Sequence, residues 1–365
     1  MSEDNLQLAT LREQIDGVDA QLLALLNQRA ALAQAVGRLK NGTVYRAERE
    51  AQVLRRMASA NSGPMPQQAI VRLFREIMSA CLALERPLTV AYLGPQGTFS
   101  EAAALRQFGH AVSTQACVSI DEVFRVVETG SVEYGIVPIE NSTEGAVNRT
   151  LDLLQTTPLH LCGEVDLRIH QSLLRRAAGL DGVQVIYSHA QSLAQCHTWL
   201  AQHLPGVPQI AVPSNAEAAK MAAENDNALA VAGEIAAEHY NLLRLFDRIE
   251  DEPDNTTRFV VIAANDVAAP SGQDKTSLLL SRPNEPGAIV RLLKPFSDHG
   301  ISLTKLESRP TRLAVSARPD AVWEYVFFVD IEGHRADVAV NAALQAVMDE
   351  GSLVKLLGSY PKSVL

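Results

Sequence analysis

The first candidates for chemistry are cationic side chains on an apolar helical pattern near the N-terminus. Apolar residues recur at steps of three and four, at Leu8, Leu11, Ile15, Val18, Leu22, Leu25, Leu32, Val36 and Leu39. This spacing is typical of a coiled-coil-like helix over residues 6–40. Arg29 occupies a place in the stripe where an apolar residue is expected, and Lys40 lies about three turns further on the same face. A charge on a buried seam is costly unless it is paired or binds a ligand, so Arg29 is expected either to have a charged partner or to line a ligand pocket.

The length of this helix indicates that a second chain takes part. It would be about 50 Å long, which is too long for a small domain to cover alone, so the pattern predicts an intertwined homodimer or a higher homo-oligomer. Arg12 lies roughly 100° round the helix from Arg29, so it reaches the same pocket only from another direction, such as from a partner helix. The alternative is a helical dimerisation module whose charges are simply solvated.

A second set of candidates consists of polar segments at the ends of predicted strands. The segments are residues 94–100, 140–145, 188–191 and 214–217, and their side chains of interest are Thr98, Ser100, Glu140, Asn141, Ser142, Thr143, Ser188, His189, Gln191, Ser214 and Asn215. Each segment is expected to precede a helix, whose first N–H groups and dipole attract anions. Four such helix starts around one cleft would hold a small polyanion. The alternative is that each segment only caps its helix.

The elements that position these residues form a multidomain chain that begins with an all-α domain. Residues 1–86 show helical periodicity, with a break at 61–66 that is rich in Gly and Pro. The expected helices cover residues 6–40, 48–60 and 67–84.

Two further domains are predicted to follow the helical one. Residues 88–266 alternate short β-rich runs with helical stretches, which predicts an α/β domain with a mainly parallel sheet and two similar lobes around a cleft. After a linker at 267–275, residues 274–365 follow the βαββαβ order of a ferredoxin-like α+β domain. No structure is assigned to the long connection at 311–322.

Composition argues against several classes of function. The chain has 365 residues, 47% of them hydrophobic and 20% charged, which suits globular domains. A formal net charge of −10 does not favour nucleic acid or an anionic membrane as a partner. No apolar run approaches the roughly 20 residues of a membrane span, and the N-terminus lacks a signal-peptide pattern. Four widely spaced cysteines indicate reduced thiols in the cytoplasm rather than disulfides or a metal site.

The helical segment resembles the all-helical chorismate mutase family. The matching stretches are LREQID, LLNQRAALAQAVGRLK, EREAQVL and LFREIMSACLALE. The resemblance implies that Arg12 of the partner chain, with Arg29 and Arg49 of the same chain, binds the carboxylates of chorismate. The reaction of this family is a rearrangement of chorismate, which needs no metal, cofactor or nucleophile. It requires only that the dianion is held in a reactive shape and that hydrogen-bond donors lie where negative charge grows.

The same resemblance implies roles for four further positions. Lys40 and Glu85 approach the ether oxygen whose bond breaks, and Glu50 accepts the ring hydroxyl. A carboxylate at Glu85 would repel that ether oxygen, so Glu85 is expected to act in its protonated form. Cys81 stands where some members carry Ser, and Arg46 where some carry an acid, so the sequence departs from the family pattern at these two positions.

The α/β segment resembles the prephenate dehydratase family, through YLGPQGTFSEAA, VPIENSTEGAV, YSHAQSLAQC and NTTRFVVIA. The resemblance implies a two-lobed fold similar to periplasmic binding proteins, and it makes Thr257 the catalytic residue of a Thr257-Arg258-Phe259 motif. Because a threonine is a poor acid, Thr257 is expected to relay a proton whose source is His189 or Glu140. The alternatives are a structural ion pair for Arg258 and core packing for Phe259.

The C-terminal segment resembles the ACT family of amino-acid-sensing domains. Residues Pro286-Gly287-Ala288-Ile289-Val290 follow the first strand, and Glu307-Ser308-Arg309-Pro310 end the next one. The resemblance implies that phenylalanine binds between paired domains and inhibits the enzyme, with Gly287 letting the backbone approach the ligand. A βαββαβ unit by itself is weak evidence, and both segments also suit an ordinary turn and strand end.

Together the three resemblances imply a bifunctional enzyme of phenylalanine biosynthesis that converts chorismate to prephenate and then to phenylpyruvate. One rival is a non-catalytic solute sensor built from a two-lobed binding domain and an ACT switch. A nearer rival is a dehydratase that prefers arogenate, and nothing in these residues decides between the two substrates.

Overall fold

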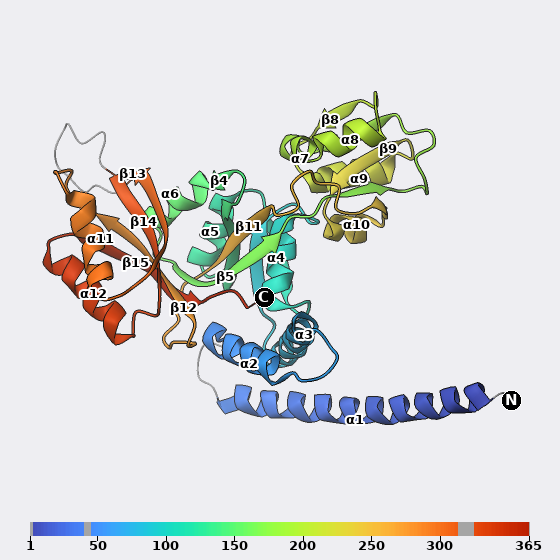
Figure 1. The fold of residues 1–365 in the computed structure, drawn as a ribbon, viewed down its shortest axis with the longest axis horizontal. Helices are drawn as coiled ribbons and strands as arrows, with labels where there is room; N and C mark the ends of the chain where they lie inside the picture. The colour runs from blue at the N-terminus through green and yellow to red at the C-terminus, as the bar shows by residue number, and fades with distance from the viewer. Residues whose placement is uncertain (1–2, 40–44, 313–324, 365) are drawn as a thin grey trace.

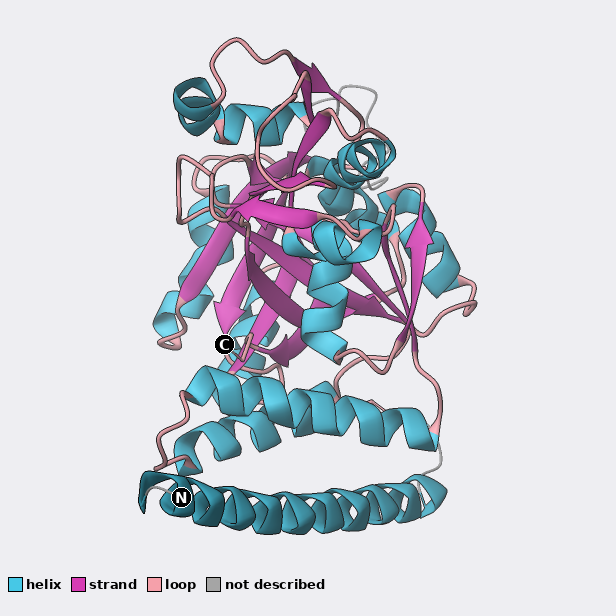
Figure 2. Cartoon of the chain, turned by 90° about the vertical axis from the view of Figure 1, so that its right-hand side faces the viewer, coloured by secondary structure: helices cyan, strands magenta, loops and turns pink. Residues whose placement is uncertain are grey.

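The computed structural model describes residues 3–39, 45–312 and 325–364. Its helical part comprises α1 (Glu3–Leu39), α2 (Ala47–Ala60) and α3 (Gln67–Glu85). Leu54 and Ala58 of α2 pack against Val71 of α3, and their side chains are almost fully buried. These two helices lie against the rest of the molecule, whereas α1 runs along their outer side (Figures 1 and 2). The predicted helices are therefore confirmed within their described residues.

The apolar stripe of α1 lies in solvent in the single chain. The stripe residues Leu8, Leu11, Ile15, Val18, Leu22, Leu25 and Leu32 all have exposed side chains, at 46 to 62%. The C-terminal end of α1 does meet α3, because a Cβ on Gly37 would lie 2.9 Å from Cγ of Glu85. A glycine at this position lets the two helices approach closely.

The α/β part consists of two lobes. The first has the sheet order β2-β1-β3-β11-β5, with β4 paired to β3. Its strands are β1 (Thr89–Leu93), β2 (Ser113–Cys117), β3 (Tyr134–Asn141), β4 (Gly145–Ala146), β5 (His160–Arg168) and β11 (Thr256–Ala263). Its helices are α4 (Phe99–Phe108), α5 (Ile120–Glu128) and α6 (Asn148–Thr156). The chain leaves this lobe after β5 and returns to it with β11.

The second lobe has the sheet order β10-β6-β9-β7-β8. Its strands are β6 (Ser172–Arg175), β7 (Val185–Ser188), β8 (Gln209–Ala211), β9 (Ala228–Ala232) and β10 (Leu243–Phe246). Its helices are α7 (Ala190–Gln195), α8 (His197–His203), α9 (Asn215–Glu224) and α10 (Glu234–Tyr240). Figure 1 shows this lobe at the end of the molecule away from the C-terminal domain.

The expectation of mainly parallel sheets is wrong. The neighbours of β1 and β7 run parallel to them. However, β11 pairs antiparallel with both β3 and β5, and β6 pairs antiparallel with both β9 and β10. The reason is the double crossing between lobes, because a strand that re-enters a sheet from the other lobe runs against the strands already there.

The C-terminal domain has the predicted βαββαβ order. It comprises β12 (Asp274–Ser281), α11 (Ala288–Asp298), β13 (Leu303–Pro310), β14 (Tyr325–Glu332), α12 (Val338–Asp349) and β15 (Leu353–Pro361), with the sheet order β13-β14-β12-β15. Leu278 and Leu280 pack with residues of the two helices on one face of the sheet. Leu279 and Phe328 instead join the core of the first lobe. The sheet is therefore buried on both faces.

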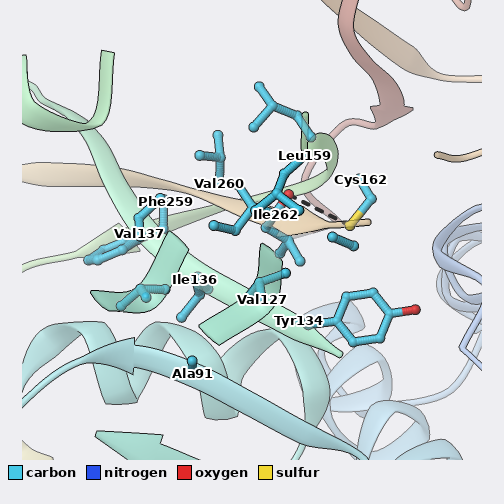
Figure 3. Close-up of a cluster of buried hydrophobic side chains, with 14 of the residues drawn as sticks. Ala91, Val127, Tyr134, Ile136, Val137, Leu159, Cys162, Phe259, Val260 and Ile262 are labelled. Carbon is cyan, nitrogen blue, oxygen red and sulfur yellow. Dashed lines mark hydrogen bonds between the residues drawn. The ribbon is translucent and has the colours of Figure 1, made fainter. Parts of the chain in front are cut away.

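The core of the first lobe is the most continuous apolar region of the described chain. Ile136, Val260 and Ile262 are fully buried at its centre (Figure 3). The Cys162 thiol donates to the Val261 carbonyl at 3.6 Å, and burial raises its pKa well above that of a free thiol. All four cysteines are free and buried, as predicted.

Candidate active sites and effector site

The two candidate residues on the described part of α1, Arg12 and Arg29, lie far apart along the helix. Arg29 is half-buried, and eight residues further along Gly37 meets Glu85 of α3. The Oε2 atom of Glu85 is buried without a hydrogen-bond partner in the described residues. Cys81, one turn before Glu85, is also buried. Lys40 lies outside the described residues, so its place in this pocket stays a prediction.

Arg12 lies far from this end of the helix. It is exposed on α1, and seventeen residues of helix separate it from Arg29 by about 25 Å. A straight helix therefore keeps Arg12 out of its own chain's pocket. The role given to Arg12 requires a second chain, and that role stays a prediction.

Arg49 and Glu50 of α2 point in different directions, since consecutive helical residues are about 100° apart. Arg49 is exposed, whereas the Glu50 carboxylate lies 3.6 Å from Nε of Arg75 and is largely buried. Burial raises the pKa of Glu50 to about 7, although the neighbouring Arg75 acts in the opposite direction. Contact of Glu50 with a ring hydroxyl stays a prediction from the resemblance.

Glu50 and Arg75 line a small cavity that the C-terminal segment, residues 361–364, also lines. Arg75 donates to the Val364 carbonyl at 3.3 Å, and Arg55 donates to the Lys362 carbonyl at 3.0 Å. The end of the C-terminal domain is thus attached to the helices of the mutase domain.

The centre of the dehydratase region is the contact between β3 and β11, where Thr257 lies opposite Asn141. The Asn141 Nδ2 atom donates to Thr257 Oγ1 and to Asn255 Oδ1, both at 2.8 Å. Thr257 is half-buried, and Asn255 is only 3% exposed. Asn255 was not a sequence candidate, although it lies two residues before Thr257 in the segment NTTRFVVIA.

The segments around this centre do not all cap helices. Thr98 precedes α4, but its hydroxyl donates to the Leu93 carbonyl at 3.0 Å, and the neighbouring Ser100 is buried. The segment 140–145 leads into β4 rather than directly into a helix. There Ser142 Oγ accepts from Thr256 N at 3.0 Å, which ties this segment to β11. The expectation of a helix start at each segment is therefore wrong for 140–145.

The second lobe holds its candidates in one polar network. The Asn215 Oδ1 atom accepts from His189 N at 3.0 Å and lies 3.0 Å from Ser188 Oγ. Gln191 N donates to the His189 ring at 3.4 Å, and Ser214 caps α9 by accepting from Glu217 N. The network continues through the buried Ser192, which binds Asn215 and Gln171. Neither Ser192 nor Gln171 was a sequence candidate, because buried Ser and Gln carry no distinctive spacing.

Glu140 and Arg258 do not share the face of Thr257 and Asn141. Side chains alternate along a strand, so the Arg258–Glu140 pair lies on the opposite face of the sheet. Arg258 binds Glu140 at 2.9 Å and Asp330 of β14 at 2.7 Å. Lys305 of β13 lies 2.9 Å from Glu140. The structure thus favours the ion-pair alternative for Arg258 over substrate binding.

These contacts also set the charge of the Glu140 carboxylate. Burial alone would raise its pKa, but Lys305 and Arg258 outweigh burial and lower it. An acid held in its ionised form is a poor proton source, so the structure argues against Glu140 as the proton source. Phe259 is only 2% exposed in the core, so its place among the substrate-binding residues is corrected to packing.

The effector candidates lie on two elements of the C-terminal domain. Gly287 has a left-handed φ of 80° before α11, where a side chain would be strained, and Ile289 is 47% exposed. Arg309 of β13 instead reaches α6, donating to Asn148 Oδ1 at 2.6 Å and Asp152 Oδ1 at 3.1 Å. Phenylalanine contacts for Gly287, Ala288, Ile289, Glu307, Ser308, Arg309 and Pro310 stay predictions.

Comparison with known proteins gives three domain matches in the predicted order. Residues 11–86 match the family model of chorismate mutase type II, residues 90–267 that of prephenate dehydratase, and residues 276–347 that of the ACT domain. A bifunctional chorismate mutase/prephenate dehydratase of Neisseria gonorrhoeae is 53% identical, over 97% of this chain and 97% of the relative. The chain belongs to the bifunctional chorismate mutase/prephenate dehydratase family.

Further relatives agree with this family. The enzyme of the same description from Pseudomonas aeruginosa is 49% identical, over 99% of this chain and 100% of the relative. A solved prephenate dehydratase of Arthrobacter aurescens, in complex with L-Phe, is 32% identical with a TM-score of 0.66 and covers 75% of this chain and 90% of its own. The part of this chain that the match does not cover is about as long as the helical domain.

Among the described residues, no helix combines the length and the apolar character that a membrane span requires. Within the same residues, no group of three or more His, Cys, Asp or Glu side chains is arranged to hold a metal ion.

Proposed function

We propose that the chain catalyses both reactions of its family, the rearrangement of chorismate to prephenate and the conversion of prephenate to phenylpyruvate. The observation that carries the proposal is the Thr257–Asn141 contact at 2.8 Å, on the half-buried face of β11. We assign the first reaction to residues 1–86, the second to 88–266 and regulation to 274–365.

For the first reaction, we assign the carboxylates of chorismate to Arg29, Arg49 and the partner's Arg12, and the ether oxygen to Lys40 and Glu85. The unpaired, buried Oε2 of Glu85 supports this assignment, because a buried polar atom without a partner is costly unless a ligand satisfies it. The exposed apolar stripe of α1 supports a homodimer formed through this helix.

For the second reaction, the ring carboxylate of prephenate leaves as CO₂, its bonding electrons enter the ring, and the ring hydroxyl leaves with one added proton as water. Thr257 donates a hydrogen bond to the leaving hydroxyl, and the helix starts of the second lobe bind the anion. The Ser188–His189–Asn215 network supports a fixed position for this segment, because Asn215 Oδ1 at the start of α9 accepts from His189 N and from Ser188 Oγ. With Glu140 paired to two cations, His189 is the remaining candidate proton source.

Phenylalanine is the proposed inhibitor, by analogy with the L-Phe complex of the Arthrobacter enzyme. Arg309 supports inhibition through the C-terminal domain, because it connects the Glu307–Pro310 segment to α6 of the dehydratase. Four free, buried cysteines suit a reducing compartment, so we propose the cytoplasm as the site of action.

The decisive experiment is product analysis from chorismate, with and without phenylalanine. Phenylpyruvate is expected as the product, and phenylalanine is expected to reduce its formation. Unconsumed chorismate would support the sensor instead. Relative turnover of prephenate and arogenate by the same preparation decides the substrate of the second reaction.

A further inference from the structure

Asn255 lies at the base of the proposed dehydratase site and is almost fully buried, at 3% exposure. Its Oδ1 atom accepts a hydrogen bond of 2.8 Å from Nδ2 of Asn141, and the same Nδ2 donates to Thr257 Oγ1 at 2.8 Å. Asn255 therefore reaches Thr257 only through the amide of Asn141.

The orientation of the Asn141 amide follows from its other neighbours. Its Oδ1 atom lies 3.0 Å from Thr143 N and 3.1 Å from Glu144 N. Backbone N–H groups can only donate, so the atom facing them must be the oxygen. Nδ2 then faces Asn255 and Thr257, and each of its two hydrogens has one acceptor.

This arrangement determines what the Thr257 hydroxyl can do. Because Thr257 Oγ1 accepts from Asn141, its own proton is left to be donated elsewhere. A hydrogen bond received by a hydroxyl oxygen also polarises the O–H bond and strengthens its donation. Without an acceptor at residue 255, one Nδ2 hydrogen of Asn141 has no partner, and the orientation of the Asn141 amide is less strongly fixed.

The backbone of Asn255 is fixed at the junction between the lobes. Its carbonyl accepts from Ile169 N at 2.9 Å. Ile169 lies between β5 and β6, where the chain leaves the first lobe, and Asn255 lies between β10 and β11, where it returns. Asn255 thus belongs to one connection between the lobes and is hydrogen-bonded to the other.

We infer that Asn255 is a positioning residue for dehydration. Through the Asn141 amide, it sets the direction in which Thr257 offers its proton to the leaving hydroxyl. The inference rests on the proposed dehydratase function and adds a residue to it.

The test is steady-state kinetics of the full-length chain with prephenate. Asn255→Ala is expected to lower kcat by about 10- to 100-fold, since small misplacements of a reacting group have effects of this size. KM should change by less than about threefold, because Asn255 does not touch the substrate. Mutase turnover in the same preparation checks folding. An unchanged kcat, or a rise in KM alone, overturns the inference.

A double-mutant cycle separates positioning from a general structural role. If Asn255 acts through Asn141, then in the Asn141→Ala background the Asn255→Ala change should lower kcat by less than about twofold more. A second fall of full size overturns the inference. Thr150→Val is the matched control, because Thr150 is fully buried in the same lobe and its hydroxyl binds only the Pro138 carbonyl among the described contacts. Its dehydratase kcat is expected to match that of the unmodified chain.

A second variant keeps the test decisive if Asn255→Ala does not fold. Asn255→Asp retains an acceptor oxygen for Asn141 and is expected to keep kcat at least fivefold above that of Asn141→Ala; equal values overturn the inference. Failure of the proposed function looks different, because the unmodified chain would then not convert prephenate at all.

Discussion

The mutase and dehydratase regions differ in how much of a site a single chain supplies. On α1, the seven stripe residues from Leu8 to Leu32 are 46 to 62% exposed, and Arg12 and Arg29 are separated along a straight helix. In the dehydratase, by contrast, Asn141 donates to both Asn255 and Thr257, and all three residues belong to one chain. A residue near the far end of a long helix, such as Arg12, can take part only in a site of another chain, whereas adjacent strands bring distant residues of one chain together.

The largest effect is expected from Thr257→Val, which removes the hydroxyl but keeps the side-chain volume. Dehydratase kcat should fall by about 10²- to 10³-fold, because a donor to the leaving group is lost. Mutase turnover by the same protein should stay within about twofold of the unmodified chain. Parallel assays with prephenate and chorismate measure both, and a joint loss would indicate misfolding.

Complementation tests whether the mutase site is shared between chains. Arg12→Ala and Arg29→Ala should each lower mutase kcat/KM by roughly 10²-fold or more, because each removes a charged contact to the substrate. Co-expression of the two variants should restore about a quarter of the normal activity, since half of the dimers are mixed and each mixed dimer has one intact site. Activity no higher than that of either variant alone would mean that one chain forms its own site.

A smaller effect is expected from separating the C-terminal domain from α6. Asp152 pairs with Arg309 at 3.1 Å and also with Arg312. Asp152→Ala should weaken phenylalanine inhibition of the dehydratase by roughly 5- to 50-fold, within the usual range of coupling between sites. Calorimetry should show unchanged phenylalanine binding, which distinguishes lost coupling from lost binding. Arg312→Ala is the control, because Arg312 is the more exposed of the two arginines and is expected to change inhibition less.

The last prediction concerns stability rather than turnover, at the buried Glu50 in the contact between the helices and the C-terminal segment. Its pKa of about 7 lies above the ordinary 4.5, so the folded chain keeps a proton that the unfolded chain has already lost between these values. Stability should therefore fall as pH rises through this interval and level off above it.

Glu50→Gln should remove this part of the pH dependence, which is worth on the order of 3 kcal/mol at most. Urea denaturation of both proteins at pH 5 and pH 8 measures it, with the exposed Glu252→Gln as control. A parallel pH dependence in the Glu50→Gln protein and the unmodified chain would show that Glu50 is not protonated in the folded state.

Much of the fold could be predicted from local pattern. The steps of three and four in residues 6–40 predicted α1, and the alternation of β-rich and helical runs predicted the α/β and βαββαβ domains in order. The mixed direction of the two sheets could not be predicted in this way, because it depends on where β6 and β11 insert after crossing between lobes.

The candidate sites divide in the same way. Local pattern was enough to show that Arg29 interrupts an apolar seam and that Thr257 and Arg258, as neighbours on a strand, face opposite sides. Their partners, Asn141 for Thr257 and Asp330 for Arg258, follow from the folded chain and not from the pattern. The physical reason is that side-chain alternation is a local property of the backbone, whereas the pairing of strands more than 100 residues apart depends on packing of the whole core.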